Sequence, residues 1–159
     1  MNTIEIELNG QPFRDSIEPR CSLADLVRDR AGMTGTHLGC EHGVCGSCTV
    51  LLDDEPVRAC ITLAMSANGR RVRTIEGFED DGPMQRLRES FAEAHALQCG
   101  FCTSGMLIAS RDIIMRNPQA TPEQLKGALS GNICRCTGYA GILEALSLAI
   151  SKSDPPERV

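Results

Sequence analysis

Polar and apolar residues alternate from Ile4 to Leu8 at the start of the chain. A period of two predicts a β-strand with one buried face and one solvent-exposed face. The Asn9-Gly10 pair that follows is a strong hairpin signal, so a second strand is expected near residues 12–14.

The apolar spacing then changes to that of a short helix. Ser22 is a good N-cap, and Leu23, Leu26 and Val27 form an apolar stripe that Gly32 is expected to end. The long segment after this helix is rich in glycine and cysteine and has no periodic apolar positions. We therefore expect a loop there.

Three more strands are expected in the first half of the chain. Residues 49–52 predict one strand, Asp53-Asp54 its turn, and Val57 lies in the returning strand. A last strand is predicted over residues 72–75. Two hairpins and one helix around a long loop indicate an α+β domain over residues 1–76.

Helical spacing dominates the second half. Gly, Asp and Pro gather without periodicity over residues 77–83, which indicates a linker between two domains. Apolar residues then recur every three or four positions and predict four helices that begin near Met84, Thr103, Thr121 and Gly141. We therefore expect a four-helix bundle over residues 84–153, followed by a disordered tail over residues 154–159.

The composition limits the possible partners and compartments. A net charge of −5 without a clustered basic surface argues against nucleic acid. No stretch approaches the roughly 18 apolar residues of a membrane span, and the charged N-terminus lacks the apolar core of a signal peptide. We therefore expect a cytoplasmic protein, whose nine cysteines are reduced and better suited to metal binding than to disulfides.

Four cysteines of the first half have the spacing of an iron–sulfur site. The motif "GCEHGVCGSCTV" holds three of them, and the full set is Cys40, Cys45, Cys48 and Cys60. A C-x4-C-x2-C run followed by a fourth cysteine is the ligand pattern of plant-type [2Fe–2S] ferredoxins. A zinc knuckle is the alternative, but zinc ligands usually come as two short-spaced couples.

Three glycines, Gly39, Gly43 and Gly46, lie inside that motif. A [2Fe–2S] cluster with four thiolates is an anion of formal charge about −2, and burying it is costly unless backbone N–H groups point at its sulfurs. Glycine permits a positive φ and a close approach of backbone amides. We therefore expect these glycines to let the loop curl around an anionic cluster.

A second set of four cysteines lies in the second half. The motifs "QCGFCTSGM" and "GNICRCTGY" supply Cys99, Cys102, Cys134 and Cys136. Each couple precedes a predicted helix, whose N-terminal amides and partial positive charge would stabilise a buried anion. The spacing alone leaves zinc as a competitor at this site. Cys21, the ninth cysteine, is expected to be a small buried thiol.

The three motifs, in this order, resemble those of the small iron–sulfur subunit of the xanthine oxidase family of molybdenum hydroxylases, including the carbon monoxide dehydrogenase small subunit. The resemblance extends over nearly the whole chain. It implies a β-grasp, plant-type ferredoxin domain followed by a four-helix bundle that holds the second [2Fe–2S] cluster. It also implies that the Gln98 side chain hydrogen-bonds a pterin, and that Cys136 is a cluster ligand lying against the same pterin.

The resemblance further implies partner subunits. In the family, a large subunit carries molybdopterin, expected here in its dinucleotide form, and a medium subunit carries FAD. Electrons pass between these sites through both clusters, and the expected assembly is a dimer of heterotrimers. The sequence has no evident acid–base pair, nucleophile motif or phosphate loop, so this chain is expected to carry electrons and to do no substrate chemistry.

Two other functions are consistent with the same cysteines. A free-standing ferredoxin with two clusters would be a monomer that serves several reductases, and the acidic net charge suits electrostatic docking. A zinc-stabilised adaptor would have no redox role and would be colourless.

Overall fold

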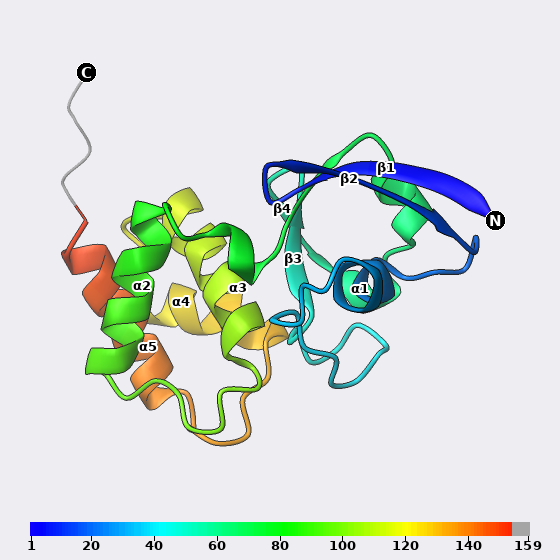
Figure 1. The fold of residues 1–159 in the computed structure, drawn as a ribbon. Helices are drawn as coiled ribbons and strands as arrows, with labels where there is room; N and C mark the ends of the chain where they lie inside the picture. Colours follow the sequence, from blue (N-terminus) through cyan, green and yellow to red (C-terminus); the bar gives the residue numbers. More distant parts are fainter. Residues whose placement is uncertain (154–159) are drawn as a thin grey trace.

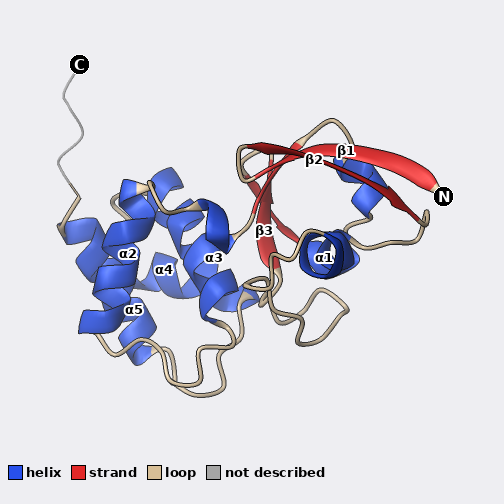
Figure 2. Ribbon diagram, viewed as in Figure 1, coloured by secondary structure: helices blue, strands red, loops and turns tan. Residues whose placement is uncertain are grey.

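All strands of the described residues lie in the first half of the chain, and four of the helices form a separate lobe in the second half (Figure 1). The computed structural model describes residues 1–153, so the tail predicted for residues 154–159 lies outside the described part. Figure 2 shows the segregation of strands and helices, which confirms the predicted α+β class.

The predicted hairpin consists of β1 (Asn2–Leu8) and β2 (Gln11–Ile17). Its turn residues Asn9 and Gly10 have positive φ values of 51° and 79°, as a tight two-residue turn requires. The apolar positions of β1 are buried and its glutamates are exposed. β2 is longer than predicted because it pairs with β1 along the full length of that strand.

Three further strands, β3 (Thr49–Leu52), β4 (Glu55–Arg58) and β5 (Arg71–Arg73), complete a five-stranded sheet of order β2-β1-β5-β3-β4. Only β1 and β5 run parallel. β5 ends before the predicted residue 75 because the Thr74 N–H donates to the Asn9 side-chain oxygen (2.8 Å) instead of to a neighbouring strand.

The helix under the sheet begins as predicted but is not regular. A capping box closes the start of α1 (Leu23–Asp25). The next turn, η1 (Leu26–Arg30), is a π-helix, in which the Ala31 N–H donates to the Leu26 carbonyl five residues earlier (3.0 Å). The helical segment thus ends just before Gly32, as predicted, but its second turn is π-helical. The apolar side chains of both turns are buried against the sheet, as in a β-grasp fold.

The second lobe is the predicted four-helix bundle, made of α2 (Gly82–Glu93), α3 (Thr103–Arg116), α4 (Pro122–Ala128) and α5 (Ala140–Ser151). α2 packs against both α3 and α5, and α4 lies against α5. The capping box expected at the start of α4 is present. No helix among residues 1–153 is long and apolar enough to cross a membrane.

The connection between the lobes is packed rather than loose. Phe78 is fully buried, and the Arg73 guanidinium lies 3.9 Å from the centre of its ring. Asp81 caps α2 and accepts hydrogen bonds of 2.8 and 2.7 Å from Arg111 of α3. The last two residues of the predicted linker already belong to α2, which begins at Gly82.

β3 lies between the two cores. Within this strand, the Val50 and Leu52 side chains point into the core of the sheet lobe, whereas the Leu51 side chain between them packs with the helices of the second lobe. α3 lies directly against this strand. Because alternate side chains of β3 enter different cores, the two lobes are held in a fixed relation at this strand.

Candidate metal centres

The thiols of the first set meet at one end of the sheet. Cys40, Cys45 and Cys48 lie in the loop before β3, and Cys60 lies in a short 3₁₀ turn directly after β4. β3 and β4 are antiparallel partners, and the Ala59 N–H donates to the Cys48 carbonyl (3.2 Å). The pairing of these strands therefore brings the fourth cysteine beside the third.

Backbone amides point at one sulfur of this set. The Cys45 N–H donates to the Cys40 Sγ (3.3 Å), and the amides of Cys45 and His42 lower the pKa of Cys40 to about 6. By contrast, burial and the neighbouring Cys48 thiol raise the pKa of Cys60 to about 11. The loop thus supplies amide donors to an anionic sulfur, while Cys60 requires a bound cation to become a thiolate at neutral pH.

Two of the three loop glycines have the predicted conformation. Gly43 and Gly46 have φ values of 85° and 78°, in the region that favours glycine. Gly39 does not have a positive φ, so the prediction of a positive φ was wrong at this position. A Cβ atom at Gly39 would lie 3.1 Å from the Cys45 Sγ, so this glycine provides space rather than backbone freedom.

The second set lies where two helices begin. Cys99 and Cys102 precede α3, and Cys134 and Cys136 lie in the loop before α5. The sulfurs of Cys99 and Cys136 are 3.5 Å apart. Burial and the neighbouring Cys134 thiol raise the pKa of Cys102 to about 12, whereas the Phe101 N–H lowers the pKa of Cys99. The four thiols therefore form two couples, and each couple joins one cysteine from either helix start.

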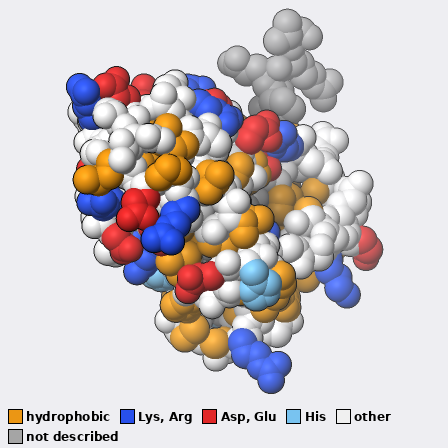
Figure 3. Space-filling model, turned by 90° about the vertical axis from the view of Figure 1, so that its right-hand side faces the viewer, with side chains coloured by type: hydrophobic (Ala, Val, Ile, Leu, Met, Phe, Trp, Pro, Cys, Tyr) orange, Lys and Arg blue, Asp and Glu red, His pale blue; other side chains and the backbone are white. Residues whose placement is uncertain are grey.

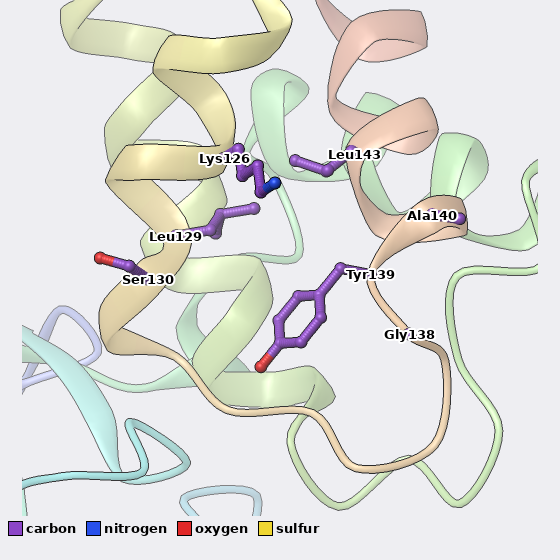
Figure 4. Close-up of a pocket in the computed structure, with 7 residues that line it drawn as sticks. All are labelled: Lys126, Leu129, Ser130, Gly138, Tyr139, Ala140 and Leu143. Atoms are coloured by element: carbon purple, nitrogen blue, oxygen red, sulfur yellow. The ribbon is translucent and has the colours of Figure 1, made fainter.

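Side chains after Cys134 hold this residue in place. The Thr137 hydroxyl donates to the Cys134 Sγ (3.2 Å), and the Cys134 N–H donates to the Tyr139 hydroxyl oxygen (2.9 Å). Burial opposes ionisation of Cys134, but hydrogen bonds from Thr137 and from nearby amides outweigh it and lower the pKa. Figure 4 shows the Tyr139 ring beneath Leu129 and Leu143, with which it lines a cavity of about 370 Å³.

The donor chemistry and the arrangement fit binuclear clusters. The thiols of the second set come together as the couples Cys99–Cys136 and Cys102–Cys134, and in the first set Cys48 neighbours Cys60. Soft thiolates in couples suit the two irons of a [2Fe–2S] cluster.

Two domain families match the two lobes. Residues 6–71 match the family described as "2Fe-2S iron-sulfur cluster binding domain". Residues 74–147 match the family described as "[2Fe-2S] binding domain". Both matches agree with the positions of the two thiol sets.

Similar proteins extend this match to nearly the whole chain. It is 48% identical over 143 residues to the nicotine 6-hydroxylase small subunit of Paenarthrobacter nicotinovorans, covering 90% of this chain and 86% of that one. It is 49% identical to the 6-hydroxypseudooxynicotine dehydrogenase complex subunit beta of the same organism, with 89% of each chain covered. The crystal structure of quinoline 2-oxidoreductase from Pseudomonas putida 86 matches with a TM-score of 0.89 at 45% identity, covering 94% of both chains.

The chain belongs to the small iron–sulfur subunits of the xanthine oxidase family of molybdenum hydroxylases. The resemblance seen in the cysteine motifs is thereby confirmed. The small iron–sulfur subunit is an electron-transfer component of a multi-subunit oxidoreductase.

One edge of the small iron–sulfur subunit exposes part of the second thiol set. Cys99, Cys136 and Gln98 are exposed, and the Gln98 side-chain amide donates to the Cys136 carbonyl oxygen (3.1 Å). Phe101 is 46% exposed and stacks on His37, with ring centroids 4.9 Å apart. In Figure 3, hydrophobic side chains lie beside a histidine at the lower end of the molecule, the end that carries the cysteine loops in Figure 1.

Sequence reasoning missed two polar side chains that join the cysteine loops, Arg58 and Asn132. Arg58 donates to the Thr49 hydroxyl (2.7 Å) and to the Gly131 carbonyl oxygen (2.6 Å). Asn132 is buried between the lobes. The one signal in the sequence was position, because each residue lies two positions before a cysteine of one set.

Proposed function

We propose that this subunit passes single electrons between a molybdenum–pterin site in a large subunit and FAD in a medium subunit. A [2Fe–2S] cluster, when bound, accepts and releases one electron. One cluster would be held by Cys40, Cys45, Cys48 and Cys60, and the other by Cys99, Cys102, Cys134 and Cys136. The residues of this chain hold, space and shield the clusters.

The observation that carries this proposal is a direct hydrogen bond between the two cysteine loops. The Ile133 N–H, next to Cys134, donates to the carbonyl oxygen of Cys45 (2.8 Å). An electron relay needs two centres at a short and constant separation, because tunnelling falls exponentially with distance. Two independent structural metal sites would not require their ligand loops to be joined.

The two sets present different surfaces to partners. The exposed Gln98 and Cys136 support contact of the second cluster with the pterin of the large subunit. Beside Cys60, the apolar side chains of Ile61 and Leu63 are 62% and 54% exposed. Exposed apolar residues next to a redox centre suit a permanent interface, so we assign this second surface to the flavin subunit.

We infer the remaining features of the complex from the family resemblance. The pterin would be a molybdopterin dinucleotide, and the assembly would be a dimer of heterotrimers in the cytoplasm. These features concern partner chains, so they are tested by purifying the whole complex rather than this subunit alone.

The test is purification of the tagged chain from its native cells, with metal, sulfide and flavin analysis. We expect a large chain with molybdenum, a medium chain with FAD, and about four irons and four acid-labile sulfides per small subunit. A brown monomer without partners would favour the free-standing ferredoxin. A colourless protein with zinc would favour the adaptor and would contradict both electron-transfer functions.

A further inference from the structure

Asn132 is a buried polar residue at the junction of the two lobes, with only 4% of its surface exposed. Its Nδ2 donates to the carbonyl oxygens of Gly46 (3.2 Å) and Gly105 (3.3 Å). Its Oδ1 accepts a hydrogen bond from Arg58 (3.3 Å), and its backbone carbonyl accepts one from the Tyr139 hydroxyl (3.3 Å). Both ends of the side-chain amide are therefore bonded, as a buried amide requires.

These contacts reach every segment that carries a cysteine of the two sets. Gly46 lies between Cys45 and Cys48, and Arg58 lies two residues before Cys60. In the second lobe, Gly105 lies three residues after Cys102, in the first turn of α3. Asn132 itself lies two residues before Cys134. Asn132 thus belongs to one of the four segments that carry the cysteines, and its side chain hydrogen-bonds to the other three.

The fit around Asn132 leaves little room for movement. A Cβ atom at Gly46 would lie 2.6 Å from the Asn132 Nδ2. A Cβ atom at Gly105 would lie 2.2 Å from the Gly46 carbonyl oxygen. Backbone of the first cysteine loop therefore touches the first turn of α3, and Asn132 seals this contact with hydrogen bonds to both carbonyls.

We propose that Asn132 is a positioning residue for electron transfer between the two clusters, and that Arg58 fixes its orientation. This inference rests on the proposed relay function. The hydrogen bonds of the side chain go to Arg58 and to two backbone carbonyls, so it acts by setting the separation of the two loops. Because tunnelling depends exponentially on distance, a small change in that separation changes the rate of transfer while each cluster stays intact.

The test is Asn132→Leu in the assembled complex, with Asn117→Leu as the matched control. Leucine is larger than asparagine but keeps its branching at Cγ and can form no hydrogen bond. Asn117 is exposed at the far end of α3, so the same substitution there controls for the change of residue. Both clusters are reduced, and the magnetic splitting between them is measured by EPR, together with the rate of electron transfer between clusters in a single turnover.

We expect Asn132→Leu to retain its full iron content, to show an altered magnetic splitting, and to transfer electrons roughly 10–100-fold more slowly. Asn117→Leu should equal the wild type. Unchanged splitting and rate in Asn132→Leu would overturn the proposal. Loss of one cluster's iron would overturn it as well, because Asn132 would then be required for cluster retention and not for spacing.

Arg58→Met provides a second, independent variant in case Asn132→Leu does not fold. Methionine keeps the aliphatic stem but removes the bonds to Thr49, Gly131 and Asn132. It should change splitting and rate in the same direction by a smaller factor, and no change would overturn the proposal. Failure of the relay function itself is distinguishable, since the wild-type chain would then either purify without partner chains or show no iron–sulfur signals.

Discussion

The backbone N–H of Ile133 donates a hydrogen bond of 2.8 Å to the carbonyl oxygen of Cys45. Cys45 belongs to the first thiol set, and Ile133 is the residue before Cys134 of the second. Covalent bonds and this single hydrogen bond therefore form a continuous route between the two thiol sets. Both loops lie at the same end of the molecule (Figure 1).

Replacing Gly105 by alanine is expected to destabilise the protein by roughly 1–3 kcal/mol. The added Cβ would lie 2.2 Å from the Gly46 carbonyl oxygen, and backbone on both sides cannot yield as a flexible side chain would. Gly127→Ala in α4 is the matched control, because no atom lies within 4 Å of its added Cβ. That variant should gain about 0.5–1 kcal/mol of helix stability. Thermal unfolding midpoints that shift equally in both variants would contradict the close contact.

Asp81→Asn tests the ion pair at the start of α2. Burial opposes ionisation of Asp81, but hydrogen bonds from Arg111 and the Met84 N–H outweigh it, so the carboxyl pKa lies below the usual 3.8. Asparagine still caps the helix, so the variant isolates the charge. We expect a loss of about 1.5–3 kcal/mol near neutral pH, the range for hydrogen bonds to charged groups.

The same variant has a defined pH dependence. Because the folded pKa of Asp81 is lowered, its stabilisation is present above the unfolded value and is lost as the pH falls through the folded value. The stability difference between wild type and Asp81→Asn should be constant above about pH 5 and narrow below it. Both proteins should lose iron to the same extent at low pH. The difference between their free energies of unfolding therefore reports on the Asp81 carboxyl. As a control, Asp54→Asn removes only an exposed pair with Arg71 and should change little.

Cys134→Ser should remove one cluster and leave the other. Its thiol is held by Thr137 and neighbours Cys102, so the serine variant disrupts one couple of the second set. Iron and acid-labile sulfide per chain should fall to about half. Cys21→Ser is the matched control and should keep all of its iron. The Cys21 thiol lies outside the cysteine motifs, is half-buried rather than buried as expected, and donates to the Ser22 carbonyl oxygen (3.5 Å). Full iron in Cys134→Ser would show that this residue is not a ligand.

Phe101→Ser should weaken assembly with the large subunit. The ring is 46% exposed beside Cys99 and Cys102, and such an apolar side chain next to a redox centre is suited to an interface. Met115→Ser changes an equally exposed residue, 53% exposed, at the opposite end of α3. The yield of large subunit that co-purifies should drop for Phe101→Ser alone, and equal yields for both variants would count against this interface.

Local signals in the sequence predicted much of the fold. Asn9-Gly10 gave the hairpin because few residue pairs accept two positive φ values in succession. The capping motifs at Ser22 and Thr121 marked helix starts because side chains there bond the first free amides. The cysteine motifs predicted the members of both thiol sets, because ligands of one site must lie within a few ångströms of one another.

Features that depend on tertiary packing could not be predicted. The π-helical turn at residues 26–30 and the buried Phe78 arise from packing that no local pattern encodes. Asn132 and Arg58 carry ordinary polar side chains, and their role follows only from the meeting of loops that are far apart in sequence. Gly39 was predicted for backbone freedom, whereas it is the nearby Cys45 sulfur that leaves no space for a side chain.

The central claim is that each half of the chain holds its own binuclear iron centre. The most direct measurement is EPR of the reduced complex, with iron, zinc and acid-labile sulfide determined on the same sample. The account predicts two distinct iron–sulfur signals of equal intensity, each of about one unpaired electron per small subunit, and about four irons without zinc. A single signal with about two irons, or stoichiometric zinc at either thiol set, would contradict it.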